Sequence, residues 1–157
     1  LTISRDSMTA SAGNVIMGST GNSLFTLRLS NNNFEDIKLS DLTITDTQVV
    51  PTTVSSFYSL EIYDGAIKVA STPSLYLTSP FSIYSKANFS FPTPIIIPKN
   101  ASKSLTVKGS VATFDSNGAV SGSEHVFSIA STSTADIVVI GKDSQLSANV
   151  KTSGIPE

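Results

Sequence analysis

The sequence predicts an all-β protein, an antiparallel β-sandwich of about eight to ten strands. Apolar and polar residues alternate with a period of two through most of the 157 positions. Turn-forming residues interrupt this alternation about every 8 to 12 positions, a spacing typical of sandwiches and barrels. Apolar residues at the helical period of 3.6 are almost absent. A closed barrel is the alternative architecture that the same pattern permits.

The composition indicates a secreted or cell-surface protein. Charged residues make up 14% of the chain, against about 25% in ordinary soluble domains. The chain also contains 28 serines and 17 threonines. Hydroxyl side chains suit the solvent-facing side of strands, where they form hydrogen bonds with each other across neighbouring strands. We therefore expect an extracellular location.

Charge and cysteine content exclude several classes of function. The net charge is −2 and no cluster of basic residues occurs, which argues against binding to nucleic acid. The absence of cysteine excludes disulfides, thiolate metal sites and a cysteine nucleophile. No apolar run reaches the length of about 18 residues that a membrane-spanning helix needs. We expect no membrane span and no nucleic-acid partner.

Two segments in the first third of the chain predict strands with a defined register. In Leu24–Ser30, the residues at 25, 27 and 29 are apolar and those between them are polar. In the segment 37–44, the phase of the apolar residues changes between Leu39 and Leu42. A β-bulge or short turn near residues 40–41 would absorb this change.

The dipeptide Asp64-Gly65 predicts a β-hairpin. It joins the alternating segments 58–63 and 66–70, and Asp-Gly between two such segments favours a tight turn with Gly65 at positive φ. Further along, Pro92, Pro94 and Pro98 surround Ile95–Ile97, which predicts an edge or crossing strand.

The last core strands are expected at 126–129 and 137–140. The whole of 1–157 is expected to be one domain, and residues 150–157 are a candidate linker to a following unit. The strands 24–29 and 138–140 carry few charges, so they are candidates for open sheet edges unless they lie centrally. The residues predicted to face the core are Phe25, Leu27, Leu29, Ile44, Leu60, Ile62, Phe89, Phe91, Leu105, Val107, Phe127 and Val139.

The order of four segments resembles the Ig-like sandwich modules of bacterial surface and S-layer-type proteins. These segments are the opening residues Leu1–Ser4 with Val15–Thr20, then Phe34–Ile44, the hairpin Leu60–Gly65, and Ile95–Val107. The resemblance covers most of the chain and implies an Ig-like fold. It also implies a role in cell-surface structure or adhesion, with neighbouring copies or domains of the same surface protein as partners and no catalytic residues.

Few residues are candidates for chemistry. His125 is the only histidine and so the only candidate base for a Ser-His-Asp system, but it follows a Gly-Ser loop in which an exposed histidine is ordinary. Asp115 and Asn117 match the first half of a calcium loop, although Asp-Ser-Asn-Gly is also an ordinary turn. Asp36, Asp41 and Asp46 are interpreted as solvated charges at a sheet edge. We therefore expect no enzymatic activity and no cofactor, with calcium as the one open alternative.

Two further sets of residues are candidates for contact with sugars. Asn88 and Asn100 each begin an N-glycosylation sequon. The four tyrosines could form a sugar-stacking platform, although tyrosine at strand ends with a wet hydroxyl is equally ordinary; they are Tyr58, Tyr63, Tyr76 and Tyr84. The main hypothesis is a structural or interaction module, a subunit or spacer of a surface layer, filament or adhesin. The alternative is a glycan-binding module.

Overall fold

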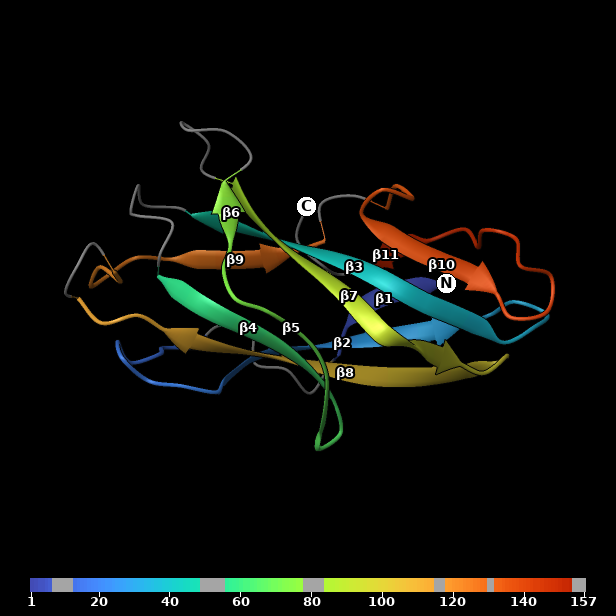
Figure 1. Cartoon of the computed structure of the whole chain (residues 1–157), viewed down its shortest axis with the longest axis horizontal. Helices are drawn as coiled ribbons and strands as arrows, with labels where there is room; N and C mark the ends of the chain where they lie inside the picture. The colour runs from blue at the N-terminus through green and yellow to red at the C-terminus, as the bar shows by residue number, and fades with distance from the viewer. Residues whose placement is uncertain (7–12, 49–55, 78–83, 115–117, 130–131, 154–157) are drawn as a thin grey trace.

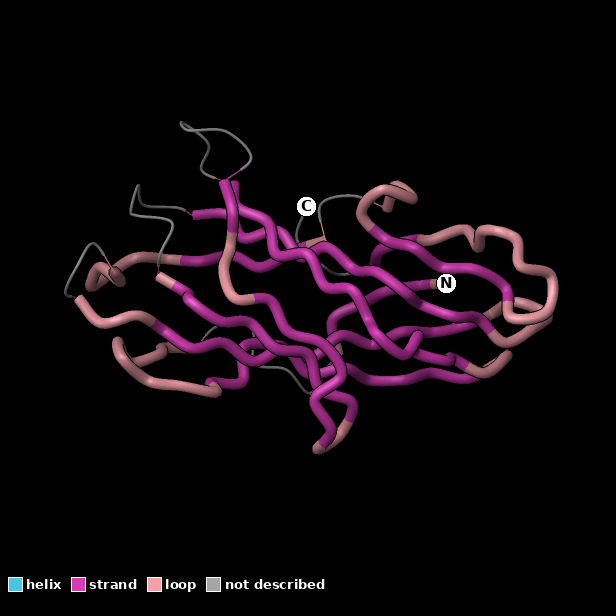
Figure 2. Tube along the Cα trace, in the orientation of Figure 1, coloured by secondary structure: helices cyan, strands magenta, loops and turns pink. Residues whose placement is uncertain are grey.

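The computed structural model contains strands, turns and loops but no helix in the residues that it describes (Figure 2). These residues are 1–6, 13–48, 56–77, 84–114, 118–129 and 132–153. The strands are β1 (Thr2–Arg5), β2 (Asn22–Asn31), β3 (Ile37–Gln48), β4 (Phe57–Asp64), β5 (Ile67–Thr72), β6 (Tyr76–Leu77), β7 (Tyr84–Ile97), β8 (Ala101–Val111), β9 (His125–Ser128), β10 (Ile137–Gly141) and β11 (Lys151–Ser153). No helix among the described residues is therefore long and apolar enough to cross a membrane.

The strands form two sheets that pack face to face (Figure 1). The six-stranded sheet has the order β11-β1-β2-β8-β4-β5, and the second sheet has the order β10-β3-β7-β6 with β9 also paired to β3. Neighbouring strands are antiparallel except for β1 and β11, which are parallel. The predicted antiparallel β-sandwich is confirmed. The strand count exceeds eight to ten only when the very short β6 and β11 are both included.

One apolar core fills the space between the sheets. Alternating residues of β2, β3, β4, β7 and β8 contribute buried side chains, as the period of two predicts. Ten of the twelve residues predicted to face the core are buried. The other two, Phe25 and Phe127, are partly buried and pack against the core from opposite sheets, with their ring centroids 5.6 Å apart.

The two local irregularities predicted from the sequence are both present. The register of β3 against β7 shifts between Leu39 and Asp41, which is where the apolar phase changes. Leu39 and Leu42 are thereby both fully buried. The β4–β5 hairpin turns at Asp64-Gly65, and Gly65 has a φ of 61°, a conformation that glycine adopts without steric cost.

The expectation of open sheet edges is wrong for the strand at 24–29 and only partly right for the strand at 138–140. β2 lies centrally, between β1 and β8, so both of its edges are paired. β10 is the outer strand of its sheet, but Ala148 N–H donates to Val139 C=O (2.9 Å) and Ile140 pairs with Ser147. The chain therefore covers part of the outer edge of β10 with its own following segment.

Candidate functional site

A groove of about 350 Å³ opens at one end of the sandwich, between the loop that follows β2 and the segment that follows β10. Two large apolar side chains stand at its rim: Phe34 is fully exposed, and Leu146 is 71% exposed. Buried Ile37 forms part of its floor. Its lining residues are Asn33, Phe34, Glu35, Ile37, Gly141, Ser144, Leu146, Ser147, Ala148 and Asn149.

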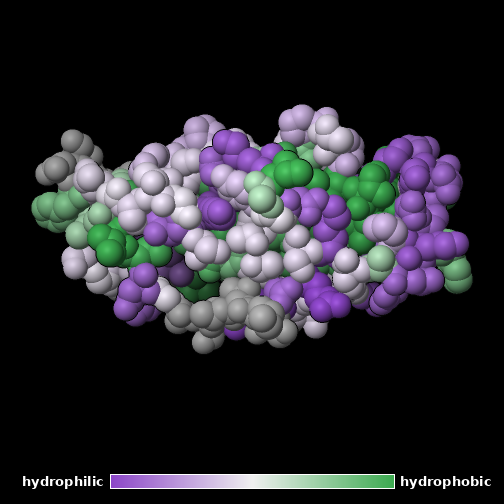
Figure 3. All heavy atoms as spheres, turned by 90° about the horizontal axis from the view of Figure 1, so that it is seen from below, coloured by the Kyte–Doolittle hydropathy of each residue, from purple (hydrophilic) through white to green (hydrophobic). Residues whose placement is uncertain are grey.

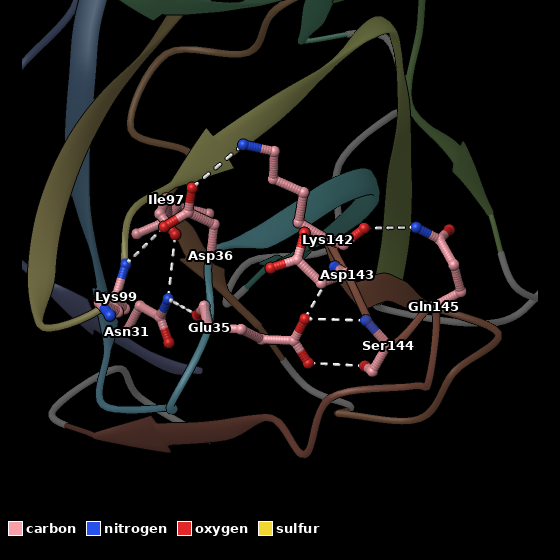
Figure 4. A network of polar contacts seen from close by, with 9 residues as sticks. All are labelled: Asn31, Glu35, Asp36, Ile97, Lys99, Lys142, Asp143, Ser144 and Gln145. Carbon is pink, nitrogen blue, oxygen red and sulfur yellow. Dashed lines mark hydrogen bonds and ion pairs between the residues drawn. The ribbon is translucent and has the colours of Figure 1, made fainter.

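The side chain of Glu35 fixes the segment after β10 against the loop after β2 (Figure 4). Its carboxylate accepts hydrogen bonds from the backbone N–H groups of Asp143 (2.8 Å) and Ser144 (3.0 Å) and from the Ser144 hydroxyl (2.6 Å). These bonds, that of the Ser144 hydroxyl first, hold the pKa of Glu35 below its usual value. A charged acceptor with three donors orders both loops, although it lies at the surface.

Asp36 links the loop after β2 to the segment after β10 and to the turn between β7 and β8 (Figure 4). Its carboxylate accepts from the backbone N–H of Lys99 (3.1 Å) and from Lys142 Nζ (3.3 Å). The Lys99 N–H, followed by Lys142, lowers the pKa of Asp36. The backbone C=O of Asp36 also accepts from the N–H of Lys142 (2.8 Å). Three loops that are distant in sequence are thus tied together.

Asn31, at the end of β2, holds the base of the same loop from the inside. It is fully buried, and its side-chain amide donates to the C=O groups of Glu35 (2.9 Å) and Ile97 (3.0 Å). Its side-chain oxygen accepts from the N–H of Asn33 (2.9 Å), a local turn of the kind that asparagine favours. Phe34 therefore projects from a loop that is hydrogen-bonded on both sides.

The groove combines exposed apolar side chains with a hydrogen-bonded polar frame. Exposed apolar side chains on an already ordered frame match the general anatomy of protein interaction sites. Among the described residues, no group of three or more His, Cys, Asp or Glu side chains could hold a metal ion. No local sequence pattern indicates the partners of Glu35, which lie more than 100 positions away.

The opposite end of the sandwich contains a polar cluster in its interior, which corrects two expectations. Asp46 is fully buried rather than solvated, and the side chain of His125 is only 10% exposed. His125 Nδ1 lies 2.8 Å from Asp46 Oδ2, and the ring of Phe57 meets the imidazole edge-on at 5.1 Å. Asp46 is in phase with Leu42 and Ile44 beyond the bulge, so strand alternation explains its inward direction.

Several polar atoms of this interior cluster have no hydrogen-bond partner among the residues that the structure describes. They are Asp46 Oδ1, Gln48 Nε2, Ser56 Oγ and His125 Nε2. The hydroxyl of Ser85 donates to Asp46 Oδ2 (3.4 Å), not to the histidine. Asp46 and His125 thus pair as in a Ser-His-Asp system, but in the described part of the chain no serine hydroxyl is bonded to the Nε2 atom, which is the contact that activates a nucleophile.

The four tyrosines do not form one platform. Tyr58 and Tyr63 belong to β4 in the six-stranded sheet, whereas Tyr76 and Tyr84 belong to β6 and β7 in the other sheet. Tyr63 donates to Glu61 (2.8 Å), which raises the pKa of Tyr63, and Lys108 Nζ lies 4.3 Å from its ring centroid. Tyr76 and Tyr84 are both about half exposed.

The two sequons differ in their surroundings. Asn100 is exposed in the turn between β7 and β8, where it has a φ of 55°. Asn88 lies within β7, and its side-chain oxygen accepts from the hydroxyls of Thr43 (3.1 Å) and Tyr76 (3.2 Å). The calcium candidates Asp115 and Asn117 lie outside the described residues.

Comparison with known proteins adds no relative. No protein-family model matches the chain, and no curated protein sequence matches it significantly.

Proposed function

We propose that this chain is a non-catalytic structural and interaction module of an extracellular assembly, a subunit or spacer of a surface layer, filament or adhesin. The observation that carries the proposal is the fully exposed Phe34 on a loop fixed by Glu35 and Asp36. Exposing an aromatic ring to water is unfavourable, and large apolar side chains in this position mark contact sites in other proteins. The loop is ordered in advance, so binding would lose little conformational entropy.

The composition and the resemblance to Ig-like surface modules support the extracellular part of the proposal. The low content of charged residues and the many hydroxyl residues fit strands that face solvent outside the cell. Within such an assembly, the partners would be neighbouring copies or domains of the same surface protein.

Photocrosslinking in the producing cells tests this proposal. A photoreactive amino acid replaces Phe34 in the parent protein, and a matched control carries it at Ile67, which is 70% exposed on the edge strand β5. We expect position 34 to yield protein adducts and position 67 to yield few. Equal yields at the two positions, or none at position 34, would contradict the proposal.

Glycan binding is the second candidate, favoured by the exposed Tyr76 and Tyr84. Tyr84 directly precedes buried Ser85 in β7, and Tyr76 pairs with Lys86, which directly follows Ser85. Both rings therefore project from the outer face of the same sheet. Aromatic rings with wet hydroxyls on one face can stack on sugars. A glycan array probed with the chain distinguishes the two candidates. Specific glycan binding that is lost in a Tyr76→Ala/Tyr84→Ala variant would favour this second function.

A further inference from the structure

Residues 146–148, which we call the outer segment, pair with the outer side of β10 in the way an antiparallel strand would. Ser147 lies opposite Ile140. The hydrogen bonds to β10 are made by the two neighbours of Ser147. Leu146 C=O accepts a backbone hydrogen bond from the end of β10 (2.8 Å), and Ala148 N–H donates one to the middle of β10 (2.9 Å).

The main chain of Ser147 is open on its other side. In an antiparallel pair, a residue whose neighbours make the hydrogen bonds turns its own N–H and C=O away from the partner strand. The N–H and C=O of Ser147 therefore point away from β10, and neither group has a hydrogen-bond partner among the described residues. Ser147 is exposed and lines the groove. The outer segment thus offers one donor and one acceptor to an added strand.

Two exposed apolar side chains line the same groove. Phe34 is fully exposed, and Leu146 directly precedes Ser147 and is 71% exposed. An apolar side chain and the open main-chain groups are therefore adjacent in the outer segment. A bound apolar side chain would remove surface of Phe34 and Leu146 from water, which is favourable.

The groove is suited to uncharged side chains. Among the described residues that line it, Glu35 alone is charged, and its carboxylate already accepts three hydrogen bonds. A cationic side chain in the groove would compete with these donors, and an anionic one would be repelled by Glu35. An uncharged side chain leaves no buried charge without a partner.

The outer segment is ordered before any partner binds. Its pairing with β10 holds it on one side, and Glu35 holds the preceding turn through the N–H groups of Asp143 and Ser144. A strand that adds to an ordered edge loses its own conformational entropy but little of the edge's.

We propose that the groove binds an extended, uncharged peptide segment of a neighbouring protein, which adds as a strand to the outer segment. The main chain of the peptide exchanges hydrogen bonds with Ser147, and one of its apolar side chains packs against Phe34 and Leu146. The inference rests on the proposed function and names the chemistry of the partner that meets Phe34. A donor and an acceptor on one residue match the main chain of a strand, and this match favours a peptide over a glycan.

Selection from a displayed library of short random peptides, with the whole chain as the target, supplies the probe. We expect the selected peptides to be rich in Val, Ile, Thr and Phe and to lack Lys, Arg, Asp and Glu. When a synthesised peptide binds, the amide of Ser147 should exchange with solvent more slowly. The amide of Ala148, already bonded to β10, is the internal control and should change little. Failure to select any binding peptide, or selection of highly charged ones, overturns the proposal.

Ser147→Pro removes the N–H that the added strand needs. This N–H makes no hydrogen bond within the described part of the chain, and edge positions whose N–H faces solvent tolerate proline. We expect a selected peptide to bind this variant about tenfold more weakly, because a peptide carbonyl loses its donor. Ser147→Ala keeps the N–H and is the matched control, with the affinity of the wild type. Equal affinities for the two variants would contradict the strand addition.

Methylation of the peptide's own amides repeats the test on the unaltered protein, whether or not Ser147→Pro folds. Each main-chain nitrogen of a selected peptide is methylated in turn. We expect one methylation to weaken binding about tenfold, because it removes the donor to Ser147 C=O, and the methylations on either side of it to have little effect. A peptide that tolerates methylation at every position rejects the proposal.

Failure of this inference is distinguishable from failure of the proposed function. Self-association that Leu146→Asp abolishes, or glycan binding that Phe34→Ser abolishes, without any peptide binding, would assign the groove to a folded second copy or to a sugar and overturn the inference. If position 34 still crosslinks to a protein on cells while no peptide binds, the proposed function stands and the peptide is rejected. Absence of that crosslink overturns the function itself.

Discussion

The two ends of the sandwich place their charged and polar side chains differently. At the groove end, the carboxylates of Glu35 and Asp36 lie at the surface, and the strands beneath bury apolar residues such as Ile37 and Leu39. At the opposite end, Asp46 and His125 lie inside the sandwich. In Figure 3 the right end is mainly hydrophilic, whereas hydrophobic residues lie near the left end and also in the middle of the molecule.

This difference teaches that exposure and hydrogen bonding are separate properties of a charged group. Glu35 is at the surface and accepts three hydrogen bonds, whereas Asp46 is fully buried and one of its oxygens has no partner. A buried polar atom without a partner costs free energy that an exposed one does not. At the groove end the charged groups are therefore hydrogen-bonded, whereas the opposite end contains buried polar atoms that have no partner among the described residues.

The largest expected effect is that of Asp46→Ala. The substitution leaves His125 buried without its only hydrogen-bond partner, so we expect a loss of about 3 to 5 kcal/mol in the free energy of unfolding. Urea titration followed by fluorescence or circular dichroism measures it. A loss below about 1 kcal/mol would contradict the buried pairing at this end.

The control for that experiment removes both partners. Replacing a buried polar pair by apolar side chains is often neutral or stabilising. The double variant Asp46→Leu/His125→Leu should therefore recover stability to within about 1 kcal/mol of the wild type, or exceed it. A double variant as unstable as Asp46→Ala would mean that the pair itself stabilises the fold.

The next largest effect is expected at the groove end, for Gly141→Ala. A Cβ atom at position 141 would overlap the Glu35 carboxylate and the Ser144 hydroxyl, so it would displace Glu35 from its donors. We expect a smaller loss of stability than for Asp46→Ala, with faster hydrogen exchange at the amides of Asp143 and Ser144. Gly13→Ala is the matched control, because no atom lies within 4 Å of its added Cβ. Unchanged exchange at both amides would disprove the role of Glu35.

Glu35→Gln is expected to have a still smaller effect, one that depends on pH. The hydrogen bonds from Ser144 and Asp143 lower the pKa of Glu35 in the folded state, so its carboxylate stabilises the fold above the unfolded value of about 4.3. This stabilisation is lost as the pH falls through the lower, folded pKa. The wild type should thus be more stable than Glu35→Gln at pH 7, and the difference should vanish in strong acid. A difference that persists in acid would contradict this account.

The smallest effects on stability are expected for the exposed apolar residues. Phe34→Ser and Ile16→Ser remove side chains that are mostly in water, so each should change the free energy of unfolding by no more than about 0.5 kcal/mol. If either variant unfolds readily, the side chain is part of the fold and not a contact surface.

Features that depend on neighbouring residues could be predicted from the sequence. The Asp64-Gly65 turn and the bulge after Leu39 follow from turn preference and from the phase of apolar residues, and both are present. The interpretation of Asp46 as a solvated charge is wrong, because the five-residue spacing of Asp36, Asp41 and Asp46 says less about its direction than the phase of its strand does. Beyond the bulge, positions 42, 44 and 46 share one face, and applying that rule would have placed Asp46 inside.

The groove could not be predicted, because it depends on contacts between distant segments. Glu35 and Ser144 are 109 positions apart, and no local pattern links them. The exposure of Phe34 also depends on how its loop is held by Asn31 and Asp36. The alternation of apolar and polar residues predicts burial only within strands. It does not predict whether apolar loop residues such as Phe34 and Ile16 are exposed.

The most direct test of the interaction function is a structure of the intact parent assembly, by electron cryomicroscopy of the cell surface. We predict that the groove beside Phe34 and Leu146 is occupied by a segment of a neighbouring protein. Together with its other contacts, the module should bury roughly 800 Å² or more against its neighbours. A module that stands alone in the assembly, with Phe34 in solvent and no protein neighbour of that size, would contradict the account and leave glycan binding as the better explanation.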